Sequence, residues 1–269
     1  MKSVLLYANE DPGLESRLQA ALDVVRLSEG HLLCLQVTPF DRFIMGDAFG
    51  GVYALPMLLE QVRKVEDAHR ERIERRLGGE GVSWEWLRCD GQPPHMVIDH
   101  SRLSDLVVLS LPTEGLPNDG SLSIAAQTVI HARTPVLAVP QSSRGINCLG
   151  PVVVAWNGSQ ESCNAMRVTI KMLQEASPVH VVTVTEDTAE FPGTSACVYL
   201  ARHGIHAELH EWPRDGRTTA DALIDAATKL AAGYVLMGAY GHSRFREAVL
   251  GGATREMLLH SPVALVLTH

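Results

Sequence analysis

The chain has 269 residues, of which 46% are hydrophobic and 20% charged, so it can bury a substantial core and is not mainly disordered. Its formal net charge is −8; residues 1–140 carry 13 basic and 19 acidic side chains, and residues 141–269 carry 10 and 12. An acidic chain of this kind is not expected to bind nucleic acid or an anionic membrane surface.

Neither a targeting segment nor a disulfide framework is expected. No apolar run approaches the roughly 20 residues that a membrane helix needs, and the apolar stretch near the N-terminus reaches Glu10 and Asp11 too early for a secretory signal. The five cysteines are scattered, with no Cys-x-x-Cys pair, which is typical of reduced thiols. We therefore expect a cytoplasmic protein.

The first half of the chain predicts five short strands separated by helices. The strands, in chain order, are Val4–Ala8, Leu32–Val37, Val82–Leu87, Leu106–Ser110 and Thr134–Val139. Apolar residues at helical spacing predict a helix over 14–25 between the first two strands. After the second strand come an insertion, Phe40–Pro56, and a long amphipathic helix over 58–77.

The second half repeats this order. Its predicted strands are Val152–Trp156, Val179–Val184, Ile205–His210, Tyr234–Gly238 and Ser261–Val266. A helix is predicted over 165–173, and a short segment over 192–203 replaces the insertion. Two halves that match in order, type and spacing indicate a duplicated domain, with one copy in 1–140, a linker in 141–150 and a second copy in 151–269.

The fold class follows from the short runs of Val, Ile and Leu between helices. Such runs are typical of strands buried on both faces of a parallel sheet with right-handed crossovers. We predict an α/β protein made of two tandem, open, five-stranded parallel-sheet domains of Rossmann-like type. In such sheets a ligand binds beyond the carboxyl ends of the strands.

Glycines cluster at that edge of the second domain. Its fourth strand runs into the segment 238–244, and Gly251-Gly252-Ala253-Thr254 opens the last helix. Glycine lets a backbone approach a ligand closely, and the free N–H groups of a helix N-terminus bind anions. The pattern favours a polyphosphate cradle to which His242, Ser243 and Arg244 add donors, although turn glycines and a solvated arginine would look the same.

These residues also carry a resemblance to a known family. Gly238-x-x-Gly241, nine residues and then Gly251 is similar to the nucleotide-binding signature of the universal stress protein family. The segments 156–159 and 261–263 resemble the same family. The resemblance covers nearly the whole chain, as a tandem of two such domains. The resemblance implies an adenine nucleotide α-hydrolase-like fold, binding of ATP, ADP or AMP with or without Mg²⁺, and a role in stress regulation. It also implies an internal pseudo-dimer through the last strands, 136–139 and 263–267, which could itself form a homodimer.

The resemblance assigns site residues one by one. Asn157 stands where family members commonly place an acidic residue against adenine, and Val184 takes a second adenine contact. Gly252 replaces a Ser or Thr, a loss that Thr254 could offset; Asn157 could equally cap a helix or shape a turn. The predicted site comprises Ala155, Trp156, Asn157, Val184, Met237, Gly238, Gly241, His242, Ser243, Arg244, Gly251, Gly252, Ala253 and Thr254.

The first domain departs from this signature. Ser110 and Thr113 replace the first two glycines, and Pro112 and Pro117 remove N–H groups from the loop. We expect a degenerate domain that does not bind ATP in the same way. Its insertion could cover a small or apolar ligand, or only pack.

No metal site and no catalytic group is predicted. His203, His206 and His210 are close in sequence, but His206 and His210 would lie about 13 Å apart along a strand, too far to share one ion. The chain has neither a Walker A motif nor a Gly-x-Ser-x-Gly elbow. Slow ATP hydrolysis or another ATP-using reaction, and a scaffold or chaperone-like role without nucleotide, remain the alternatives.

Overall fold

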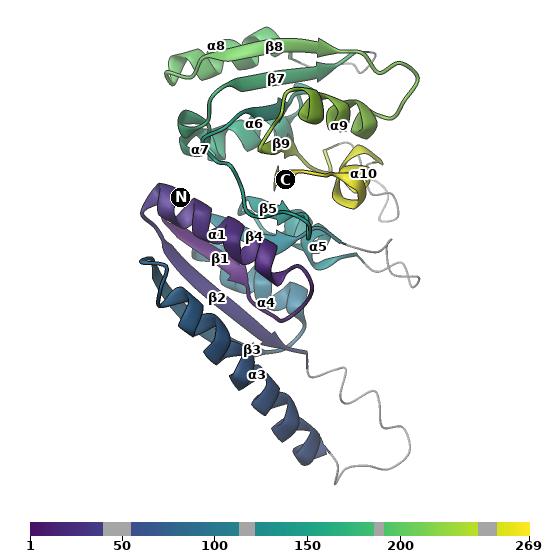
Figure 1. The fold of residues 1–269 in the computed structure, drawn as a ribbon. Helices are drawn as coiled ribbons and strands as arrows, with labels where there is room; N and C mark the ends of the chain where they lie inside the picture. The colour runs from purple at the N-terminus through teal and green to yellow at the C-terminus, as the bar shows by residue number, and fades with distance from the viewer. Residues whose placement is uncertain (40–54, 113–121, 186–190, 242–251) are drawn as a thin grey trace.

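In the computed structural model, residues 1–39, 55–112, 122–185, 191–241 and 252–269 are described (Figure 1). Residues 40–54 of the predicted insertion, and the predicted site residues His242, Ser243, Arg244 and Gly251, lie outside them. The elements of the first half are β1 Ser3–Tyr7, α1 Leu14–Ser28, β2 His31–Thr38, α3 Leu55–Leu77, β3 Ser83–Asp90, α4 Pro93–His100, a 3₁₀ turn Ser101–Leu103, β4 Leu106–Ser110, α5 Ile124–His131 and β5 Val136–Val139. Those of the second half are β6 Val152–Ala155, α6 Gln160–Val168, α7 Ile170–Glu175, β7 Val179–Val184, α8 Gly193–Arg202, β8 Ala207–Trp212, α9 Thr219–Lys229, β9 Tyr234–Gly238, α10 Gly252–His260 and β10 Ala264–Thr268.

Each half forms a five-stranded parallel sheet, which confirms the predicted fold class. The strand order is β3-β2-β1-β4-β5 in the first half and β10-β9-β6-β7-β8 in the second. The last strands, β5 and β10, pair antiparallel with Ala138 opposite Leu265, so that the two sheets join into one sheet of ten strands. The two halves thus meet edge to edge through their last strands (Figure 1).

Helices cover both faces of the joined sheet. Successive strand residues point to opposite faces, so that Val4 and Leu6 belong to one buried cluster and Leu5 to the other. The first cluster takes in side chains of α1, α3, α6, α7 and α8, and the second takes in side chains of α4, α5, α9 and α10. Both clusters extend through both halves, which makes the pair of domains one packed body.

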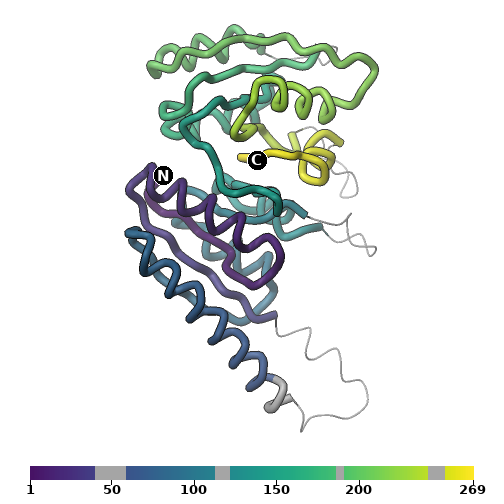
Figure 2. Tube along the Cα trace, in the orientation of Figure 1, coloured from purple at the N-terminus to yellow at the C-terminus, as the bar shows by residue number. Residues whose placement is uncertain are grey.

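The two ends of the chain lie at the junction of the halves (Figure 2). Met1 and Arg167 of α6 line the same cavity, and the His269 carbonyl accepts a hydrogen bond of 3.2 Å from the Asn164 side chain. In the described ranges, no helix has the length and apolar character that would let it cross a membrane.

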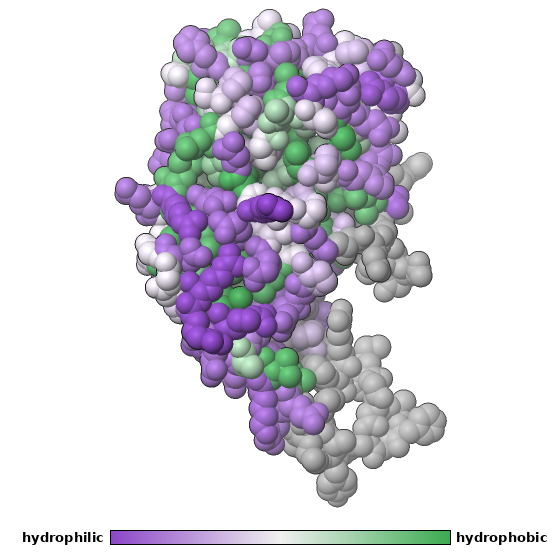
Figure 3. Space-filling model, in the orientation of Figure 1, coloured by the Kyte–Doolittle hydropathy of each residue, from purple (hydrophilic) through white to green (hydrophobic). Residues whose placement is uncertain are grey.

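The long helix α3 confirms the predicted amphipathic helix over 58–77. Ile73 and Leu77 are buried against the sheet, and His69 is buried with its Nε2 2.7 Å from the Ala8 carbonyl. The opposite side carries ion pairs, among them Arg70 with Glu74 at 2.7 Å. Figure 3 accordingly shows a largely hydrophilic surface over α1 and α3.

Two predicted elements differ from the structure. The predicted helix over 165–173 is broken into α6 and α7 at Thr169, where the backbone leaves helical geometry. The Thr169 hydroxyl donates a hydrogen bond of 2.6 Å to the Ala165 carbonyl. Such bonding from a threonine to the preceding turn is known to bend helices. The third strand of the second half begins at Ala207 rather than at residue 205, so that His206 precedes the strand.

Candidate functional site

We refer to the carboxyl ends of β6, β7 and β9, the edge where a ligand is expected, as the crevice of the second half. Strand β6 has β7 on one side and β9 on the other, which is the reversal of strand order where ligands bind in open sheets. The segment after β6 is shaped by Asn157, whose Oδ1 accepts a hydrogen bond of 3.1 Å from the Ser159 N–H. Ser159 in turn caps α6 by accepting from the Ser162 N–H. Asn157 therefore shapes a turn and leaves its side chain exposed at the crevice.

The apolar members of the predicted site divide between the two faces of the sheet. Ala155, Val184 and Met237 pack against the cluster covered by α9 and α10. Trp156 packs against the cluster of α6 and α8, donates its indole N–H to the Phe191 carbonyl at 3.0 Å, and lines a cavity of about 240 Å³ there. The structure thus places Ala155 beside Met237 across β6 and β9, puts Val184 on the same face of the sheet, and holds the Trp156 side chain on the opposite face.

Gly238 and Gly241 lie against the start of α6. A Cβ on Gly238 would fall 2.5 Å from backbone atoms of Glu161 and Ser162. A Cβ on Gly241 would meet the Glu161 carboxylate. Close packing against backbone therefore requires a glycine at 238, whereas at 241 a Cβ would meet the movable end of an acidic side chain.

Gly252 is different, because a Cβ there would meet nothing within 4 Å. It begins α10 and is followed by Ala253, which is half-buried, and Thr254, which is buried. The Thr254 hydroxyl lies 3.4 Å from the Tyr240 N–H and accepts from it, tying the loop after β9 to α10. This bond uses a lone pair of the Thr254 oxygen, so the hydroxyl still has its own hydrogen to donate, and its role in offsetting the missing phosphate contact stays a prediction.

Two buried hydroxyls at this edge lack a hydrogen-bond partner among the described residues. They belong to Tyr240 and to Thr268, and Thr268 pairs with Gly238 across β10 and β9. Burial raises the pKa of the Tyr240 hydroxyl to about 12, so it stays protonated and can donate. Buried hydroxyls are normally paired, so these two favour a polar group at the carboxyl ends of β9 and β10.

In the first half the equivalent crevice is filled by an arginine. Arg17 of α1 is almost fully buried and donates to the Tyr7 carbonyl at 2.6 Å and to the Ser110 hydroxyl at 2.9 Å. It also donates to the Asn9 carbonyl and pairs with Asp11 at 2.6 Å. One guanidinium therefore occupies the carboxyl ends of β1 and β4.

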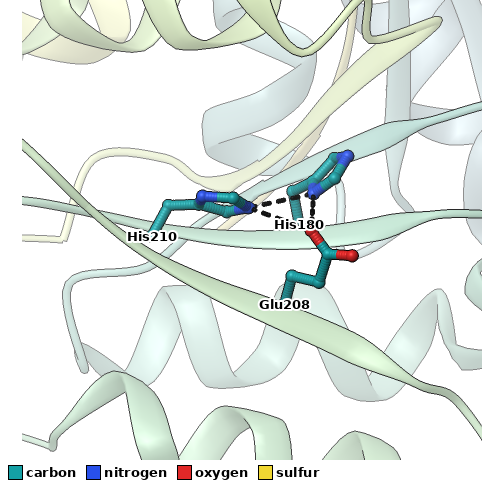
Figure 4. Close-up of side chains that lie close together, drawn as sticks. All are labelled: His180, Glu208 and His210. Atoms are coloured by element: carbon teal, nitrogen blue, oxygen red, sulfur yellow. Dashed lines mark hydrogen bonds and ion pairs between the residues drawn. The ribbon is translucent and has the colours of Figure 1, made fainter.

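A cluster that the sequence analysis missed joins β7 and β8. His180 Nδ1 lies 3.0 Å from His210 Nε2, and Glu208 Oε2 lies 3.5 Å from the first nitrogen and 3.6 Å from the second (Figure 4). Burial, and secondarily the neighbouring His210, lower the pKa of His180. His180 and His210 are 30 residues apart in sequence, so their spacing gives no sign of the cluster; the signal that predicts it is the pairing of the two predicted strands, which sets His180 opposite Glu208.

Comparisons with known proteins agree with this architecture. No protein-family model and no curated protein matches the chain. Among solved structures, a universal stress protein from Archaeoglobus fulgidus DSM 4304 is 15% identical with a TM-score of 0.74, covering 99% of this chain and 96% of its own. A putative universal stress protein from Pseudomonas aeruginosa UCBPP-PA14 is 16% identical with a TM-score of 0.57, covering 99% and 92%. The chain therefore has the fold of a tandem, two-domain universal stress protein.

Proposed function

We propose that the protein is a stress-response regulator that binds an adenine nucleotide, ATP, ADP or AMP, in its second domain. The observation that carries the proposal is an asymmetry between the halves. Arg17 lies eight residues after Asn9, and Ala165 lies eight residues after Asn157. The arginine that fills the first crevice is thus replaced by a small residue in the second.

The start of α10 supports the phosphate end of the proposed site. Gly252 has open space where its side chain would be, and α10 runs from Gly252 to His260. The first N–H groups of a helix have no partner within the helix and favour negative charge. The unpaired hydroxyl of Tyr240, a residue that packs on the face covered by α10, is a further donor near this edge.

The adenine end of the proposed site rests on Asn157, Ala155 and Val184. An exposed amide offers both a donor and an acceptor to a purine edge, and the two apolar side chains offer a surface for its ring. Because the Glu161 carboxylate lies at Gly241, a polyphosphate reaching that point would carry a neutralising cation, which favours the Mg²⁺ complex.

The test uses two variants of equal size. Gly252→Asp places a negative charge at the start of α10, and Gly252→Asn places a neutral side chain there; a Cβ at this position meets nothing within 4 Å, so both variants should fold. Calorimetry and thermal shift with ATP, ADP and AMP, with and without Mg²⁺, should show binding in the wild type and weaker binding to the Asp variant than to the Asn variant. Equal binding to both variants would contradict the proposed phosphate position.

The same measurements separate the alternatives. A wild-type chain that binds none of the three nucleotides would favour the scaffold or chaperone-like role. Multiple-turnover release of phosphate or AMP that is lost in the Gly252→Asp variant would favour slow ATP hydrolysis or another ATP-using reaction at this site.

A further inference from the structure

The cluster of His180, Glu208 and His210 has the shape of a metal site. His180 comes from β7, and the other two residues are two apart on β8, so that their side chains lie on the same face of the sheet. Figure 4 shows the two imidazoles and the carboxylate pointing at one another. The three candidate ligand atoms are separated by 3.0, 3.5 and 3.6 Å.

These separations match the geometry of a four-coordinate ion. Ligand atoms placed tetrahedrally about 2.0–2.1 Å from Zn²⁺ are separated from one another by about 3.3–3.4 Å. We infer that His180 Nδ1, His210 Nε2 and a Glu208 carboxylate oxygen bind a divalent late first-row metal ion, with Zn²⁺ as the type ion. Two imidazoles and one carboxylate leave a fourth position for water.

A hydrogen bond between the two histidines explains only part of the arrangement. Such a bond needs only two nitrogen atoms and one proton. Here a carboxylate oxygen of Glu208, two residues before His210 on β8, also lies close to both nitrogens. His180 is held by burial, with 7% of its side chain exposed, and Glu208 is 68% exposed. A buried ligand fixes the geometry, and an exposed carboxylate gives the ion a route from solvent.

The proposed ion would act on a different part of the domain from the nucleotide. His180 is the second residue of β7, near its amino end, whereas the nucleotide crevice lies at the carboxyl ends of the strands. Strand β8 is one of the two edge strands of the ten-stranded sheet, the other being β3. An ion shared by β7 and β8 would fasten this edge strand and stabilise the folded state by mass action.

The test measures Zn²⁺ binding to chelator-treated protein by calorimetry. Wild type should bind one ion per chain, and His210→Ala should lose this site. Glu208→Gln should weaken the affinity for Zn²⁺ at least about tenfold, because losing even a residue that only hydrogen-bonds to a metal ligand costs about that much. Both substitutions lie on the edge strand, where the fold tolerates them best. Co²⁺ in place of Zn²⁺ should give the strong visible absorption of a four-coordinate site in wild type only.

Two control variants remove histidines outside the cluster. His206→Ala changes an exposed residue just before β8. His31→Ala changes a histidine that meets one acid, Glu85, at 3.6 Å and has no third candidate ligand among the described residues. Both should bind Zn²⁺ as the wild type does, and so should Gly252→Asp. The inference fails if the wild type has no stoichiometric site, if a control variant loses it, or if His210→Ala and Glu208→Gln both retain it.

Discussion

The guanidinium of Arg17 lies 2.9 Å from the hydroxyl of Ser110, joining the first helix to the end of β4 across 93 positions of sequence. Gly13, which precedes α1, permits this approach, because a Cβ there would meet the Ser110 side chain. The second half has the reverse arrangement, with Glu161 at the helix and Gly238 at the strand end. In both halves the first helix thus approaches the end of the fourth strand closely. The glycine that allows the approach precedes the helix in the first half and ends the strand in the second.

Replacing the buried arginine should destabilise the first domain. Arg17→Met keeps the bulk of the side chain but leaves the Tyr7 and Asn9 carbonyls without their charged donor. We expect a loss of about 2–4 kcal/mol in the free energy of unfolding, measured by urea denaturation followed by circular dichroism. Arg102→Met removes an exposed ion pair with Asp99 and should change stability by less than about 0.5 kcal/mol. Similar losses in both variants would contradict the structural role of Arg17.

The two kinds of glycine in the second domain should respond differently to alanine. Gly238→Ala forces a Cβ against backbone atoms of α6 and should cost about 1–3 kcal/mol of stability. Gly252→Ala enters open space and should be neutral or stabilising by up to about 1 kcal/mol. Thermal and urea unfolding measure both. Because Gly238 is a packing residue, loss of nucleotide binding after its substitution would not identify the site, whereas Gly252 variants can.

Asn157→Asp should keep the turn and strengthen nucleotide binding. A carboxylate oxygen can accept the Ser159 N–H as the amide oxygen does, and its charge near the start of α6 is favourable by roughly 0.5 kcal/mol. The proposed site has this side chain against adenine, whose amino group a carboxylate accepts from more strongly than an amide oxygen does, so we expect affinity for ATP to rise about fivefold, close to the net value of one hydrogen bond. Calorimetry with wild type in parallel measures the change, and a lower affinity would argue against an adenine contact at Asn157.

The buried thiols should react slowly with alkylating reagents. Burial raises the pKa of Cys34 and of Cys148 to about 12, so that at about pH 8 only roughly one thiol in ten thousand is the reactive thiolate. The half-buried Cys89 and Cys197 should be labelled first, and Cys34 and Cys148 only after unfolding in urea. Mass spectrometry of iodoacetamide-treated protein gives the order, and rapid native labelling of Cys34 would contradict it.

The sequence by itself determined the repeated order of strands and helices, because buried parallel strands require runs such as Val179–Val184 and amphipathic helices require apolar residues at helical spacing. Both signals are local, so the fold class and the duplication could be predicted. The position of the candidate crevice follows from the same order. Tertiary structure decided which side chains meet there: Trp156 turns to α8, Thr254 turns to Tyr240, and Glu161 approaches Gly241.

Two features could arise only from long-range packing. Arg17 fills the first crevice because α1 crosses the ends of β1 and β4, a contact that no local pattern encodes. His180 meets Glu208 and His210 because β7 and β8 pair in one register, and a shift by one residue would send the side chains of one strand to the other face of the sheet. The two histidines are 30 residues apart in sequence, and only the pairing of β7 with β8 places them in contact.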